Sequence, residues 1–217
     1  MIQIEKTEVY GWEPAIRGMR NPKNSWDRSD SAWDFVEDPS IINPNDQVEF
    51  VLGPNDADLM RRLCKGGPVH AKFRRMLVVY VDINAPLYWW KEFDTYKVGT
   101  VCNSCSTMHK IHSRDLTRDD FSHEKLSIPG KQLLDAVVDF LNHNRKMFLA
   151  TNDKNFWENM IQMLPTSYNQ KRTIMFNYEV LENMYHSRLF HKLDEWHKIC
   201  AWIESLPNSW LITGKES

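Results

Sequence analysis

Apolar and polar positions alternate along residues 2–10 (IQIEKTEVY), which is the period of a β-strand with one buried face. A second, more deeply buried strand is predicted over residues 76–83, because the run MLVVYVDI is rich in β-branched and apolar side chains. Between them, residues 55–64 (NDADLMRRLC) carry apolar positions at helical spacing and are followed by two glycines. The Asn84-Ala-Pro86 stretch has Pro where a first helical turn accepts it, so we predict a short aromatic-rich helix over residues 86–95.

The second half of the chain is predicted to be mainly helical. Amphipathic spacing indicates helices over residues 131–148 and 154–163, and one long helix from Asn177 to about Ser205. Residues 21–46 and 98–123 show no clear period and are predicted to be irregular. The pattern therefore favours a single α+β domain over residues 1–217, with a central sheet flanked by helices and a helical C-terminal half.

Composition narrows the class of protein. The 217 residues are 42% hydrophobic and 26% charged, with a net charge of −2, which is typical of a globular protein. No basic excess suggests a nucleic-acid partner, and no apolar run or leader pattern suggests a membrane, so we expect a cytoplasmic protein. The four cysteines do not suggest a disulfide framework.

Cys102 and Cys105 are followed by His109 and His112, in the spacing C-x2-C-x3-H-x2-H. Such a set could hold a tetrahedral zinc ion, and the two thiols could form a redox pair. However, zinc modules usually separate their ligand pairs by a dozen or more residues, whereas only three residues separate these pairs. We therefore predict no metal site, and cysteines that are reduced and serve packing or line a site.

Arg188 follows Met184 by four residues and Leu181 by seven, so a helix would place its guanidinium on an apolar face. A cation on such a face needs a partner, and the planar fork of arginine suits a phosphate or the edge of a pyrimidine. A structural ion pair, for example with Glu195, is the alternative. Asn177 and Asn183 on the same predicted helix are poor helix formers and are often capping or surface residues.

These signals share one order and spacing, and the chain resembles the flavin-dependent thymidylate synthases, the ThyX family. That family has a His, a strand ending in Ala-Pro, a short helix, and then the signature R-H-R-x-x-S-x-N-E-x-S-x-R-Y. Here His70 and Ala85-Pro86 stand at the family separation, and the signature falls on residues 95–108 (TYKVGTVCNSCSTM). A second block of the family, Leu-Pro and then an Asn-rich helix with an Arg, matches Leu164-Pro165 and the segment from Asn177 to Trp196. The resemblance covers roughly residues 60–205.

Several signature positions differ from the family. The R-H-R triplet is Thr95, Tyr96 and Lys97, so two of its three charges are absent. The signature Glu is Asn103 and the second Ser is Cys105. An asparagine in place of glutamate both donates and accepts hydrogen bonds, which suits a cytosine edge as well as a uracil edge.

The resemblance implies a set of site residues with assigned roles. Arg188 would hold the pyrimidine edge, Asn177 and Asn183 the isoalloxazine, and His70 and Lys97 the outer parts of FAD. The complete set comprises Arg188 and Cys105 as catalytic residues; His70, Lys97, Thr100, Asn177, Asn183 and His191 as cofactor-binding residues; and Glu92, Asn103, Cys105, Ser106 and Arg188 as substrate-binding residues.

The resemblance also implies an activity and an assembly. One reading is an FAD-dependent enzyme that transfers a one-carbon unit to C5 of a pyrimidine deoxynucleotide, dUMP or dCMP. Methylenetetrahydrofolate would then be the carbon donor, NADPH the reductant and a homotetramer the assembly. The other reading is a non-catalytic nucleotide-binding or scaffold protein that kept the fold and lost FAD binding.

Overall fold

The computed structural model describes residues 2–35 and 48–215, and it divides into two compact units. Unit 1 comprises Met1–Thr7, Tyr80–Met175 and Leu193–Lys198, and unit 2 comprises Glu8–Val79, Phe176–Lys192 and Ile199–Ser217. The prediction of a single domain over the whole chain is not tested by this division.

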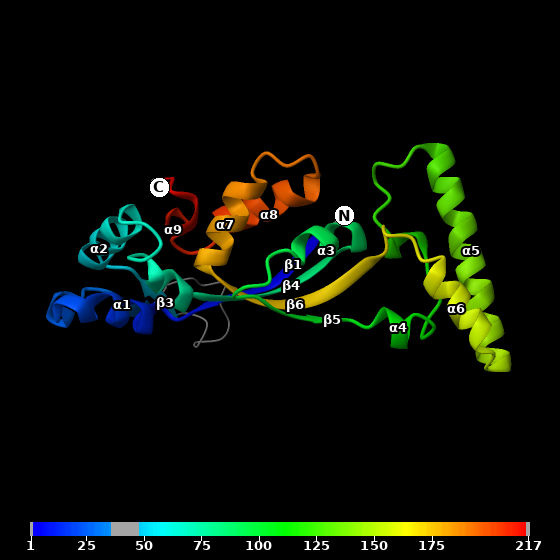
Figure 1. Cartoon of the computed structure of the whole chain (residues 1–217), viewed down its shortest axis with the longest axis horizontal. Coiled ribbons are helices and arrows are strands. Elements are labelled where there is room, and N and C mark those ends of the chain that lie inside the picture. The colour runs from blue at the N-terminus through cyan, green and yellow to red at the C-terminus, as the bar shows by residue number, and fades with distance from the viewer. Residues whose placement is uncertain (1, 36–47, 216–217) are drawn as a thin grey trace. The chain divides into compact units, whose positions relative to one another are not determined.

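The predicted α+β class with a central sheet is confirmed, and the sheet is antiparallel. The sheet has the strand order β1-β4-β6-β5 (Figure 1). Its strands are β1 (Gln3–Tyr10), β4 (Val78–Pro86), β5 (Val101–Ser104) and β6 (Asn169–Asn177). The strands β1 and β4 correspond to the two strands that the sequence pattern predicts. No helix among the described residues has the length and apolar character needed to cross a membrane.

Unit 1 is built around a buried aromatic cluster. Helix α3 (Leu87–Phe93) contributes Trp89, Trp90 and Phe93, each at most 1% exposed, and Trp196 of α8 (Asp194–Glu204) packs on them. The ring centroid of Trp89 lies 4.8 Å from those of both Trp90 and Trp196. This cluster explains the aromatic density of the predicted helix: these side chains form the core beside β4.

A second part of unit 1 is a pair of long helices, α5 (Ile128–Thr151) and α6 (Lys154–Gln162), which pack side by side (Figure 1). Leu134, Val138 and Leu141 of α5 form a core with Met160 of α6. The predicted helices over residues 131–148 and 154–163 are thus confirmed, with α5 three residues longer at each end.

The described part of unit 2 contains the small sheet of β2 (Ala32–Phe35) and β3 (Val48–Val51). Its helices include α1 (Trp12–Arg20), α2 (Pro54–Lys65), α7 (Tyr178–Arg188) and α9 (Trp210–Thr213), and the C-terminal part of α8 also belongs to it. Gly11 joins β1 to α1 at φ +98°, and a Cβ there would lie 2.0 Å from the carbonyl oxygen of Met76. Only glycine therefore fits this turn.

Three sequence-based predictions were wrong. Residues 98–123 were expected to be irregular but contain β5 and the short helix α4 (Thr107–Lys110). Residues 21–46 were also expected to be irregular but contain β2, and residues 36–47 lie outside the described part. The predicted helix start at Asn84-Ala-Pro86, in contrast, is confirmed: these residues end β4, because a residue before proline is pushed towards extended backbone, and Pro86 caps α3, which begins at Leu87. The predicted long helix is two helices, α7 and α8, and Asp194 and Glu195 supply the acidic first turn of the second.

Candidate functional site

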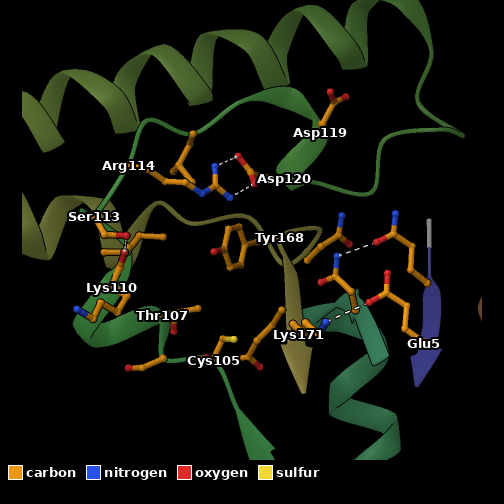
Figure 2. Close-up of a pocket in the computed structure, with 17 residues that line it drawn as sticks. Glu5, Cys105, Thr107, Lys110, Ser113, Arg114, Asp119, Asp120, Tyr168 and Lys171 are labelled. Carbon is orange, nitrogen blue, oxygen red and sulfur yellow. Dashed lines mark hydrogen bonds and ion pairs between the residues drawn. The ribbon is translucent and has the colours of Figure 1, made fainter. Parts of the chain in front are cut away.

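A cavity of about 590 Å³ lies in unit 1 where the signature segment ends (Figure 2). Its walls come from β1, the end of β4, the turn after β5, residues 110–120 and the start of β6. Cys105 and Ser106, two of the predicted site residues, line it. We call this space the Cys105 cavity.

The backbone of Cys105 is fixed on both sides by the neighbouring strand. Strands β5 and β6 pair antiparallel, with Cys102 opposite Ile174 and Ser104 opposite Arg172. Beyond the strand, the Cys105 N–H donates to the carbonyl of Lys171 at 2.9 Å, and the Cys105 carbonyl accepts from the Gln170 side-chain amide at 2.7 Å. The exposed thiol therefore sits on a turn held in place by β6.

Ser106 starts α4. Its hydroxyl oxygen accepts the backbone N–H of His109 at 3.0 Å, which satisfies a donor at the open end of the helix. Small polar side chains at this turn leave the cavity mouth open. This is the structural reason why the sequence changes from bulky aromatic residues to Cys, Asn, Ser and Thr.

Charged side chains of both signs surround the cavity. Arg114 makes a two-pronged ion pair with Asp120, and Lys171 contacts Glu5 at 3.1 Å, as the dashed lines in Figure 2 show. Lys110 makes no ion pair with any residue that the structure describes, and its side chain is exposed. Lys110 is therefore the cation of this cavity that remains available to an anionic ligand.

The protonation states of two cavity residues are set by their surroundings. Burial raises the pKa of the Tyr168 hydroxyl, and the nearby Asp120 carboxylate raises it further, so Tyr168 is a neutral hydrogen-bonding group. Burial opposes ionisation of Asp120, but hydrogen bonds from Arg114 and from Thr117 outweigh it and lower the pKa of this carboxyl. Asp120 is thus a carboxylate at neutral pH and keeps Arg114 in place.

Unit 2 has a separate cavity of about 860 Å³ that contains His70, and we call it the His70 cavity. Its apolar surface comes from α1, α2 and the 3-10 turn Lys72–Met76, including Met19, Leu63 and Phe73. Among the described residues, its lining includes no Asp or Glu, whereas five side chains can carry positive charge. They are Lys23, Arg62, His70, Lys72 and Arg75.

Two of these cations are already paired. Arg62 contacts Asp58 at 2.9 Å and Arg75 contacts Glu179 at 2.5 Å. Lys23 and Lys72 make no ion pair with a described residue. A cavity lined by both apolar and cationic side chains suits a ligand that combines a flat ring with phosphate groups.

The remaining predicted residues of unit 1 have mixed surroundings. The Glu92 carboxylate accepts the indole N–H of buried Trp196 at 2.8 Å, and Asn103 lies on β5 opposite Thr173. Lys97 is exposed. The Thr100 hydroxyl is buried and has no hydrogen-bond partner among the described residues.

The remaining predicted residues of unit 2 lie on or just after α7. The Asn177 side chain caps this helix by accepting the Val180 N–H at 3.0 Å, and Asn183 is exposed and contacts Ser187. Arg188, at the last turn, and His191 are half-buried. Their roles towards a cofactor or substrate stay predictions.

Cys102 lies on β5, where the Arg172 guanidinium approaches its sulfur at 3.8 Å, and Cys105 lines the cavity. Among residues 2–35 and 48–215, no cluster of three or more His, Cys, Asp or Glu could hold a metal ion. The prediction that both thiols are reduced and metal-free awaits a metal assay.

Sequence reasoning did not identify the charged residues of the two cavities. Lys171 follows Asn169-Gln170 in a polar half-strand, Lys110 and Arg114 lie in a segment without a period, and Lys23 and Lys72 look like ordinary surface lysines. The signal that was available is the pair Lys171-Arg172 followed by TIMF, a polar-to-apolar run that fits a strand leaving a core.

No protein-family model and no curated protein sequence matches the chain. Solved structures do match over nearly its whole length. Thymidylate Synthase X (ThyX) from Helicobacter pylori with FAD and dUMP is 15% identical, with a TM-score of 0.68, covering 99% of this chain and 98% of that one. A UMP/dUMP methylase, PolB from Streptomyces cacaoi, bound with 5-Br dUMP, is 13% identical with a TM-score of 0.58, covering 99% and 95%. The chain therefore has a ThyX-like fold.

Proposed function

We propose that this protein binds a pyrimidine deoxynucleotide in the Cys105 cavity and transfers a one-carbon unit to C5 of its base. One observation carries the proposal: near the end of the segment that aligns with the ThyX signature (residues 95–108), Cys105 and Ser106 line a polar cavity. The full-length likeness to ThyX with FAD and dUMP supports it. A cavity of about 590 Å³ lies in the size range of small-molecule sites.

Within the proposal, each side chain has a role that its surroundings support. Lys110 binds the nucleotide phosphate, because its charge is not matched by a described carboxylate. The neutral Tyr168 hydroxyl hydrogen-bonds the ligand, and Cys105, on its fixed turn, lies beside the reacting ring. Arg188 belongs to unit 2, and its role at the base edge stays a prediction of the resemblance.

FAD is the cofactor that the fold implies, and the chain has residues that fit it. The His70 cavity of unit 2 offers an apolar surface, and its Lys23 and Lys72 make no ion pair with a described residue. When bound, FAD supplies the hydride that turns the transferred methylene into a methyl group. Methylenetetrahydrofolate would donate the carbon: the bond from C5 to this carbon forms, the C5 proton is lost, and the bond from the carbon to the folate nitrogen breaks, which releases tetrahydrofolate. NADPH would supply the electrons that reduce FAD.

A direct test of the nucleotide site is titration with dUMP and with dCMP. Lys110→Ala should weaken binding about ten- to a hundredfold, the loss expected for one charge-assisted hydrogen bond worth roughly 1.5–3 kcal/mol. Lys154→Ala is the matched control, because Lys154 is an exposed lysine of the same unit whose contacts, with Glu158 and the Trp157 ring, are to its own helix and not to the cavity. Equal nucleotide affinity in wild type and Lys110→Ala would remove the phosphate role.

The catalytic step is tested with dUMP carrying tritium at C5, in the presence of FAD, NADPH and methylenetetrahydrofolate. Release of tritium to water is expected from the wild type and should fall strongly in Cys105→Ala. Tight dUMP binding without any tritium release would leave the second candidate function.

That second candidate is a nucleotide-binding protein without flavin chemistry. It is favoured by the residues that stand at the positions of the family's R-H-R triplet. The centroid of the Tyr96 ring lies 6.0 Å from that of Trp196, and the Thr95 hydroxyl donates a hydrogen bond to the Glu92 carbonyl. Neither side chain carries a charge, and both are engaged within the chain, so Lys97 is the one cation at the three positions that could meet a cofactor phosphate. The absorption spectrum of the purified protein separates the candidates, since bound flavin absorbs visible light.

A further inference from the structure

Helix α5 has a second apolar face that no described part of the chain covers. Leu134, Val138 and Leu141 point into the core shared with α6. In contrast, Leu133 is 68% exposed and Phe140 is 41% exposed. A helix with one buried stripe needs apolar residues on that stripe only, so the exposed ones require a separate explanation.

The exposed residues follow a heptad pattern along the helix. The stripe consists of Leu133, Ala136, Phe140, His143, Met147 and Ala150, with alternating steps of three and four residues. This is the spacing of the two core positions in a helix pair. From residue 133 to 150 it extends over about 26 Å at 1.5 Å per residue.

Two charges flank the stripe on one side. Asp139 and Lys146 are exposed, lie seven residues apart and make no ion pair with a described residue. Their helix neighbours differ: Asp135 pairs with Arg118, and Arg145 contacts Asp115 at 2.7 Å. The charges beside the core are thus satisfied within the chain, whereas the two beside the stripe are not.

We propose that the stripe on α5 binds the same stripe of a second copy of this chain, with the two helices antiparallel. An antiparallel pair centred between Phe140 and His143 sets Phe140 against His143 of the other copy, Ala136 against Met147, and Leu133 against Ala150. The two-fold symmetry then brings Asp139 of each copy beside Lys146 of the other, twice in one interface. In a parallel pair the two Asp139 side chains would lie on opposite edges of the interface, and the contacts between Asp139 and Lys146 would not form.

The charge pattern gives a test that does not depend on the proposed enzymatic function. In sedimentation velocity of the full chain, Asp139→Lys and Lys146→Asp should each raise the dissociation constant of this association about tenfold or more, because each creates two like-charge contacts. The double variant Asp139→Lys/Lys146→Asp restores opposite charges and should associate like the wild type. A double variant that associates no better than the single ones would overturn the antiparallel arrangement.

The apolar part is tested with Phe140→Asp, which should abolish the association. Leu149→Asp is the matched control, because Leu149 is also an exposed apolar residue of α5 (56%) but lies off the stripe. Circular dichroism shows whether both variants remain folded. If Phe140→Asp leaves the sedimenting mass unchanged in a folded protein, α5 is not the interface.

Cysteine cross-linking reports the direction of the pair independently of its strength. Mixing Ala136→Cys protein with Met147→Cys protein should give a cross-link between positions 136 and 147, identified by peptide mapping so that the native cysteines do not confuse it. Cross-linking of Ala136→Cys to itself at position 136 would show a parallel pair and would overturn the proposal.

Discussion

A buried carboxylate in unit 2 gives the strongest stability prediction. Asp56 of α2 is 0% exposed and pairs with the Arg20 guanidinium at 2.6 Å, and Arg20 is itself 3% exposed. The other carboxylate oxygen accepts the hydroxyls of Ser29 and Ser31 and the backbone N–H groups of Asp30 and Ser31, at 2.7–3.1 Å. One side chain thus ties the segment after α1 to α2.

Replacing Asp56 with Ala should lower the free energy of unfolding by about 3–5 kcal/mol. Breaking a buried ion pair from one side costs this much, because the Arg20 charge stays buried without its carboxylate. For a chain of this size, each kcal/mol corresponds to a shift of about 2–4 °C in melting temperature. The expected loss is therefore about 6–20 °C, measured by thermal melting at neutral pH.

The same contacts predict how the effect depends on pH. Burial opposes ionisation of Asp56, but the hydrogen bonds from Ser31, Ser29 and Arg20 outweigh it and lower its pKa below the ordinary value of 3.8. A lowered folded-state pKa means that the stabilisation is fully present above the unfolded pKa and is lost as the pH falls through the folded pKa. The difference between wild type and Asp56→Ala should hence be constant from about pH 5 to 8 and shrink below about pH 4.

Asp58→Ala is the control on the same helix. Its carboxylate contacts Arg62 at 2.9 Å, but the two side chains are 64% and 59% exposed, so its loss should cost under about 1 kcal/mol. An Asp56→Ala protein that melts within about 2 °C of wild type would refute the reasoning, because it would mean that Arg20 is satisfied without the carboxylate.

Three further predictions concern the site and the assembly. Arg188→Ala should weaken dUMP and dCMP binding about ten- to a hundredfold while α7 stays helical; unchanged affinity with a lower melting temperature would make Arg188 a structural residue. Cys102 and Cys105 should be reduced and metal-free, and stoichiometric zinc that is lost in Cys105→Ser would contradict this. Light scattering should show a homotetramer, and a monomer at all protein concentrations would argue against it.

The elements that sequence alone could predict are those with one clear period. The strand over residues 76–83 and the helices around α2, α5 and α6 have strong apolar patterns. Strand β5 was missed because its four residues are all exposed and lie at the sheet edge, so no alternation marks them. Strand β6 was missed because its first residues, Asn169 to Lys171, are polar and line the Cys105 cavity, so they show no apolar alternation.

Only those residues of the candidate site that align with the ThyX motifs could be predicted from the sequence. The resemblance led to Cys105, Ser106 and His70, which line cavities, but not to Lys110 or Lys72, because an isolated lysine carries no signal in a sequence. On α5 the sequence pattern erred in the other direction, because it assigned to the core two residues that are exposed. Leu133 and Phe140 were counted with the apolar face of the helix, and the structure separates them from the core.

The tryptophan cluster of unit 1 gives the protein an optical signature. Trp89, Trp90 and Trp196 are buried, with Trp89 4.8 Å from both of the others, so their electronic transitions should couple and give a strong circular dichroism couplet in the ultraviolet. All three rings belong to unit 1, whereas Asp56 belongs to unit 2. Loss of the couplet would therefore report the unfolding of unit 1, and comparing it with the loss of the helix signal of the whole chain would show which unit a given substitution weakens.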